Sequence, residues 1–167
     1  MRTIGILILT TAACLADSAA GIQWTPPAAW KAQPQRPMRA ATYVVPAAAG
    51  DREDGECAVF YFGPGQGGGV EENIKRWIGQ FSTVEKEPVR KKQTIAGMNV
   101  TLLDMAGVYA ASSGPMMASK TTKPGYRLLG AIVEAPEGAV FFKFTAPEKT
   151  VAAHEPAFQA LLKSIRK

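Results

Sequence analysis

Two stretches of the sequence echo each other, AVFYFGP at residues 58–64 and AVFFKFTAP at residues 139–147. Each is a run of apolar, β-branched and aromatic residues that ends at glycine or proline, which is the pattern of a buried strand. A segment with helical periodicity follows each of them. Two strand-to-helix units joined by close hairpins predict an antiparallel sheet, because close hairpins leave little room for parallel crossovers. The predicted class is therefore α+β, with two main helices packed on one hairpin-built sheet.

The helix after the first echo has the clearest pattern in the chain. Its apolar positions recur at helical spacing, and charged residues take the other face. These apolar positions are Val70, Ile74, Trp77, Ile78 and Phe81. We expect Trp77 to anchor this helix in the core.

The second helix is predicted from Thr150, a candidate N-cap, towards the end of the chain. Phe158 and Leu161 lie on its apolar stripe, and His154 lies on the same stripe as a packing residue. Pro156 falls inside the helix, so we expect a kink or a restart there.

Two β-hairpins are predicted between the helices. The first joins residues 89–95 to 98–109, and the second joins residues 126–134 to 139–145. Residues 110–125 are polar and are predicted to form a long loop between the hairpins.

The N-terminal residues 1–20 have the features of a secretory signal. Arg2 is followed by an uncharged apolar run at residues 3–16 and then by small residues that end at Ala20. A spanning helix needs about 20 apolar residues, so a signal is favoured over a membrane helix. We expect cleavage near Ala20 and export to the periplasm or the medium. The alternative is a lipid anchor at Cys14, which stands in a lipoprotein-like box.

Residues 21–167 are predicted to form one domain, in which residues 21–37 make a Pro/Ala-rich arm held by Trp24 and Trp30. Cys57 lies in a strand and is expected to be a buried thiol. The formal net charge of +5 favours anionic partners or simply solubility. No stripe of basic and aromatic residues indicates nucleic acid, and no motif predicts a cofactor.

The C-terminal helix and the hairpins together resemble a known fold. A Pro/Trp-bearing N-terminal segment, two hairpins and a last helix with Phe158, Leu161, Leu162 and Ile165 are similar to the Mog1/PsbP-like fold of bacterial extracytoplasmic proteins. The resemblance covers most of residues 24–167. It implies a binding or assembly factor for a larger partner, and it supplies no catalytic residue.

A glycine-rich connection at residues 63–69 matches G-x-G-x-x-G between a strand and a helix, where backbone N–H groups could hold a phosphate. The candidate anion-binding residues are Gly65, Gly67 and Gly68. Against this reading, Pro64 removes one donor, and Glu71 and Glu72 bring negative charge to the site. A structural connector is the alternative.

The predicted loop 110–125 is the leading candidate for a recognition surface, because long loops without their own structure are often functional. It carries Met116 and Met117 as an adaptable apolar centre, with Lys120 and Lys123 as a basic rim. The alternative is that both Met side chains fold back onto the domain.

A basic cluster is a second partner-facing feature, and protection of a strand edge is its alternative role. Its members are Lys86, Arg90, Lys91 and Lys92. The leading hypothesis is therefore a non-enzymatic extracytoplasmic binding or assembly module. The alternative is a protein, or an enzyme, that binds a small anion or a nucleotide through residues 63–69.

Overall fold

The computed structural model describes the backbone of residues 16–112 and 120–167, and the side chains of residues 16–110 and 121–167. Its main sheet is built from β3 (Lys31–Ala32), β4 (Arg39–Val45), β5 (Gly55–Phe60), β6 (Phe81–Ile95), β7 (Met98–Ser112), β8 (Lys120–Ala135) and β9 (Gly138–Pro147). A separate hairpin is formed by β1 (Asp17–Ala19) and β2 (Ile22–Trp24), and the helices are α1 (Val70–Ile78) and α2 (Glu148–Lys163).

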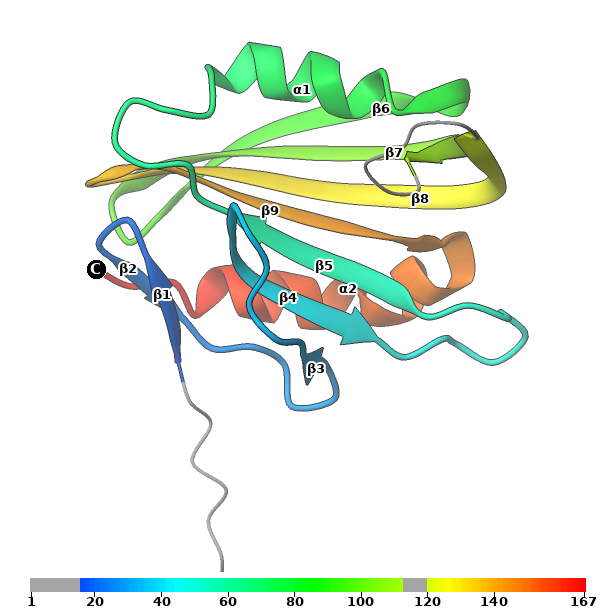
Figure 1. The fold of residues 1–167 in the computed structure, drawn as a ribbon, viewed down its shortest axis with the longest axis horizontal. Helices are drawn as coiled ribbons and strands as arrows, with labels where there is room; N and C mark the ends of the chain where they lie inside the picture. The colour runs from blue at the N-terminus through cyan, green and yellow to red at the C-terminus, as the bar shows by residue number, and fades with distance from the viewer. Residues whose placement is uncertain (1–15, 113–119) are drawn as a thin grey trace, which may run out of the picture.

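The main sheet has the strand order β3-β4-β5-β9-β8-β7-β6, and every pairing in it is antiparallel. The two echoed strands, β5 and β9, are neighbours in its middle. In Figure 1 α1 lies beside β6 and β7 at the top of the view, and α2 lies below β9. The predicted class, an antiparallel α+β fold with two main helices, is confirmed.

The helices cover opposite faces of the sheet, as the alternation of side chains along β8 shows. Leu128 and Ile132 belong to the apolar cluster under α1. Leu129 and Ala131 belong to the cluster under α2 and the N-terminal hairpin. Successive side chains of a strand point to opposite faces, so one strand supplies both clusters. This is why residues 128–133 of β8 and 139–142 of β9 include no polar side chain.

The first helix is shorter than its apolar pattern predicts. Gly69 precedes α1 and donates its N–H to Glu72 Oε2 at 3.1 Å. Gly79 ends the helix, and Phe81 begins β6. The predicted extension to Phe81 is therefore wrong, although Phe81 packs in the same cluster as α1. The buried residues of α1 are Asn73, Ile74 and Trp77.

Both predicted hairpins are confirmed, with longer arms than expected. The turn of the first lies at Ala96 and Gly97, which both have positive φ, as a tight two-residue hairpin turn requires. The prediction of a loop over residues 110–125 is wrong at both ends. Ala110 pairs with Thr122, for example, so the hairpin ladder continues into the predicted loop.

The second helix is capped by a residue that is distant in sequence. Thr150 is not the N-cap as predicted, because α2 begins directly after Pro147. Asp51 accepts hydrogen bonds from the N–H of Thr150 at 2.9 Å and from its hydroxyl at 2.6 Å. The helix then continues through Pro156 as one element, so the predicted restart does not occur.

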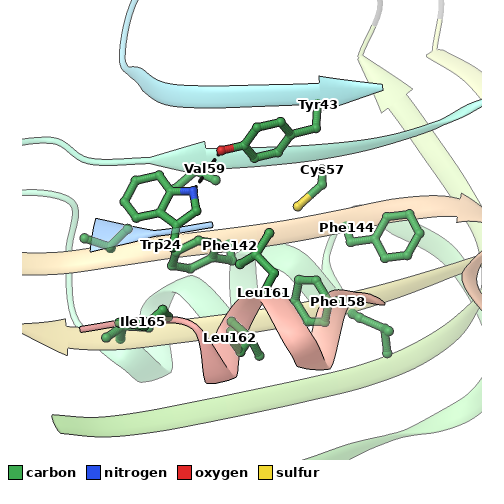
Figure 2. Close-up of a cluster of buried hydrophobic side chains, with 14 of the residues drawn as sticks. Trp24, Tyr43, Cys57, Val59, Phe142, Phe144, Phe158, Leu161, Leu162 and Ile165 are labelled. Carbon is green, nitrogen blue, oxygen red and sulfur yellow. Dashed lines mark hydrogen bonds between the residues drawn. The ribbon is translucent and has the colours of Figure 1, made fainter. Parts of the chain in front are cut away.

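The N-terminal hairpin is built into the larger core. Tyr43 is fully buried, and its hydroxyl donates to Asp17 and accepts from Trp24 Nε1 at 2.8 Å. Figure 2 shows the Trp24 indole next to the Tyr43 hydroxyl and beside Phe142, above the apolar side of α2. The backbones of Gln23 and Arg166 also exchange hydrogen bonds at 2.8 and 3.0 Å. The hairpin thus connects the start of the described chain to its end.

The predicted signal boundary at Ala20 runs through this hairpin. Ala20 is 4% exposed, and its carbonyl accepts the N–H of Glu137 at 3.2 Å. Removal of residues 1–20 would take β1 with it. Cleavage near Ala20 stays a prediction.

Candidate partner-binding cleft

A cleft beside α1 combines aromatic rings with cationic groups. It has a volume of about 160 Å³ and lies between α1, the end of β5 and β9. We call it the α1 cleft. Its lining residues are Phe60, Phe62, Asn73, Arg76, Trp77, Gln80, Phe141 and Lys143. Two larger hollows lie beside Val70 and beside Met38, but their linings hold no aromatic ring and one aromatic ring respectively.

The aromatic wall of the α1 cleft follows from strand periodicity and register. Phe60 and Phe62 are two positions apart and lie on the same face, with nearly parallel rings and centroids 6.1 Å apart. Phe60 is paired with Phe141 across β5 and β9. The rings of Phe62 and Phe141 are also in contact, with centroids 5.8 Å apart. Phe60 and Phe62 remain partly exposed, so this wall is accessible from outside.

The other wall is Trp77, which lies against the backbone of β8. A Cβ atom placed on Gly130 would lie 2.3 Å from Trp77 Cζ3, so only glycine at this position allows the indole to approach this closely. Trp77 is 5% exposed. The prediction that it is a core anchor is confirmed, and Trp77 also contributes to the lining of the cleft.

The glycine-rich connection, residues 63–69, packs at Gly67 against the Phe62 and Phe141 rings of the aromatic wall. Gly67 has a φ of +91°, and a Cβ there would lie 2.7 Å from the Phe62 ring. Asn73 fastens the loop by donating to the carbonyls of Gly67 and Gly69 at 2.8 and 2.9 Å. Glu72 accepts the Gly69 N–H, so a carboxylate stands where a bound anion would sit. Anion binding by Gly65, Gly67 and Gly68 stays a prediction.

Two cations line the cleft, and neither forms an ion pair within the described part of the chain. Arg76 is exposed and donates to Asn73 Oδ1 at 3.2 Å. Lys143 donates to the neutral oxygens of Gln80 and Tyr109, the second at 3.0 Å. The eight lining residues include no carboxylate. The cleft therefore carries uncompensated positive charge next to aromatic surface.

A row of tyrosines extends from the cleft along the same face. Lys143 lies over the ring of Tyr109, which stacks on Tyr126 at 5.9 Å. Lys123 lies at the far end, where it forms an ion pair with Glu53. The hydrogen bonds from Lys123 and then Tyr126 hold the pKa of Glu53 below its usual value. The charge of Lys123 is thus balanced within the domain.

The remaining residues of the predicted recognition loop are only partly described. Met116 and Met117 lie outside the described residues. Lys120 begins β8, where its backbone pairs with Ser112. The hypothesis that these residues contact a partner stays a prediction.

The predicted basic cluster lies on β6, which is at one end of the strand order of the described sheet. Arg90 forms an ion pair with Glu71 at 2.8 Å, and Lys86 forms one with Asp104 at 3.4 Å. This part of the cluster is therefore balanced by neighbouring acids.

Sequence reasoning missed a buried ionic cluster on the α2 face. Arg127 is 8% exposed and donates to both carboxylate oxygens of Asp104 at 2.8 and 2.9 Å, and it contacts Glu155 of α2 at 2.9 Å. Burial would raise the pKa of Asp104, but the hydrogen bonds and charge of Arg127 outweigh it and lower this pKa. The cluster joins α2 to the sheet. The sequence feature that could have predicted this cluster is Arg127, which directly precedes an apolar run in a predicted strand, because a buried charge needs a partner.

The side chains that most often carry catalysis are used in packing. His154 Nδ1 accepts from Trp30 Nε1 at 3.2 Å, and its Nε2 contacts the carbonyl of Pro46 at 3.0 Å. Cys57 is fully buried, and burial raises the pKa of its thiol. Across residues 16–112 and 120–167, no group of three His, Cys, Asp or Glu residues could hold a metal. No helix in the described part of the chain is long and apolar enough to cross a membrane.

These features define an α+β protein in which one antiparallel sheet is covered by a helix on each face. The fold is shared with cyanobacterial PsbP (CyanoP) from Synechocystis sp. PCC 6803, with a TM-score of 0.55, 11% identity and coverage of 98% of both chains. It is also shared with PA94 from Pseudomonas aeruginosa, a protein of unknown function, with a TM-score of 0.52 and 15% identity over 74% of this chain and 78% of that one. The chain thus has the PsbP/Mog1-like fold that its sequence resembles. No protein-family model and no curated protein matches it.

Proposed function

We propose that the protein is an extracytoplasmic, non-enzymatic binding module that recognises a protein partner through the α1 cleft. The observation that carries this proposal is the placing of partly exposed Phe60 and Phe62 next to Arg76, which has no ion-pair partner among the described residues. Aromatic and arginine side chains contribute most of the energy in protein interfaces. A cleft that offers aromatic and arginine side chains, with no carboxylate in its lining, is suited to binding a protein partner.

The extracytoplasmic location rests on residues 1–20, which have the pattern of a secretory signal. In cells that produce the full chain with a C-terminal tag, we expect the tagged protein in the periplasm or the medium, shortened at its N-terminus. A diacylglycerol on Cys14, detected by intact mass, would replace plain cleavage with lipid anchoring. An uncleaved chain in the cytoplasm would refute the location.

Site-specific photo-crosslinking tests the binding function. A photoreactive residue in place of Gln80 would lie at the cleft, and one in place of Ala153 would lie on the exposed side of α2 as a control. A third placed at Met116 examines the predicted recognition loop. We expect a defined crosslinked protein from the Gln80 position and none from Ala153. Equal crosslinking from all three positions, or none from Gln80, would show that the α1 cleft is not the binding surface.

A further inference from the structure

The α1 cleft has the size and chemistry of a pocket for one side chain. We infer that it binds a single aromatic ring from an acidic peptide segment of the partner. This inference rests on the proposed binding function and specifies what the partner presents.

The volume of the cleft fits one ring. It measures about 160 Å³, and a protein cavity of about 150 Å³ is large enough to bind benzene. Phe62 and Phe141 form one side, and Trp77 borders the other. Aromatic rings prefer edge-to-face or offset contacts with other rings, so this wall favours a ring over an aliphatic chain. A larger ligand would extend out of the cleft, as the rest of a peptide does.

The charge of the cleft selects the residues that flank the ring. Arg76 and Lys143 are part of the lining of the cleft, and this lining includes no carboxylate. Nearby Arg39 lies over the Phe60 ring at 5.3 Å, although Glu56 balances its charge at 2.9 Å. Carboxylates beside the inserted ring would meet Arg76 at the rim, and a basic peptide would be repelled. The favoured occupant is therefore acidic.

The occupant is not a segment of this chain that the structure leaves out. Residues 1–15 and 113–119 contain no aromatic residue and no Asp or Glu. Neither segment offers the ring and the carboxylates that the cleft is suited to bind. These two segments are therefore not the expected occupant.

Three blocked pentapeptides test the inference directly. The first is Asp-Glu-Phe-Glu-Asp, the second has Ala in place of Phe, and the third is Lys-Lys-Phe-Lys-Lys. Binding to the folded chain is followed by NMR through the indole N–H signals, with Trp24 as an internal control because it lies in the other apolar cluster and bonds to Tyr43. We expect the first peptide to move the Trp77 signal and not that of Trp24. Loss of the ring should weaken binding by about tenfold or more, and the basic peptide should show no saturable shift.

A matched pair of charge variants checks the role of Arg76. Arg76→Gln removes a cation at the cleft, and Lys75→Gln removes one from the preceding exposed position of α1, outside the cleft lining. We expect Arg76→Gln to weaken binding of the acidic peptide by about threefold to fivefold, since an exposed ion pair contributes up to about 1 kcal/mol, and Lys75→Gln to leave it nearly unchanged.

The inference is overturned if the Phe and Ala peptides bind equally, if both charge variants weaken binding alike, or if the Trp77 signal does not move. Its failure is separable from failure of the proposed function. A crosslinked partner from Gln80 without peptide binding would keep the binding function and reject the acidic aromatic segment.

Discussion

Gly130→Ala is expected to weaken the packing of α1 on the sheet, because the added methyl group would overlap the indole of Trp77. The Cβ would lie 2.3 Å from Cζ3 and 2.7 Å from Cε3. Non-bonded carbons rest at about 3.5–4.0 Å, so the ring must move by roughly 1 Å or more. The φ of Gly130 is outside the left-handed region, so the backbone accepts alanine without strain.

The size of the effect follows from two opposing terms. Overpacking a core costs about 1–3 kcal/mol, and a rigid indole against a strand backbone belongs to the upper part of that range. Replacing glycine by alanine at a compatible position stabilises by about 0.4–1 kcal/mol, because the unfolded chain loses freedom. We therefore expect Gly130→Ala to lower the free energy of unfolding by about 1.5–2.5 kcal/mol, measured by urea denaturation with far-UV circular dichroism.

A double-mutant cycle with Trp77→Ala isolates the contact. Trp77→Ala alone should cost about 3–5 kcal/mol, because it leaves a core cavity. In that background the methyl group at Gly130 has room, so the second substitution should be neutral or slightly stabilising. The coupling energy should reach about 2 kcal/mol, whereas independent sites add within about 0.5 kcal/mol. Additive effects, or a Gly130→Ala change below about 0.5 kcal/mol, would refute the proposed packing of α1.

A chain that begins at Gly21 should unfold more easily than one that begins at Ala16, by about 1–3 kcal/mol, because it leaves the buried Tyr43 hydroxyl without its acceptor Asp17; equal urea midpoints would contradict this. Asp104→Asn should lower stability by about 2 kcal/mol at pH 7 through the lost charged hydrogen bonds to Arg127. Folding lowers the Asp104 pKa, so the contribution of Asp104 to the free energy of unfolding is complete above its usual pKa of about 3.9 and is lost as pH falls through the folded pKa. A difference in unfolding free energy between Asp104→Asn and the wild type that stays constant down to about pH 2 would count against this. Cys57 should resist thiol reagents in the native protein and react quickly in urea, because only the exposed thiol ionises readily; rapid labelling without denaturant would show that the core opens.

Local periodicity was enough to predict three features from the sequence. These are the α+β class, the antiparallel hairpins and the role of Trp77 as the core anchor of α1. Alternation with period two and apolar spacing of three to four residues are properties of a strand or helix by itself. The boundaries were less predictable. Phe81 fits the helical stripe of α1, yet Gly79 ends the helix and Phe81 begins β6. Residues 110–125 are polar enough for a loop, yet their two ends pair as a continuation of the β7–β8 ladder.

Only the tertiary structure brought together the residues of the α1 cleft, the Arg127 cluster and the Asp51 cap. Phe60 and Phe141 are far apart along the chain and meet because β5 and β9 pair in one particular register. Asp51, in the connection between β4 and β5, meets Thr150 because α2 packs on the same sheet. Local sequence determines which faces are apolar, because side-chain direction depends on neighbouring dihedral angles. Which faces meet, and in which register, depends on the packing of the whole chain, because a shift by one residue would turn every side chain of a strand to the other face.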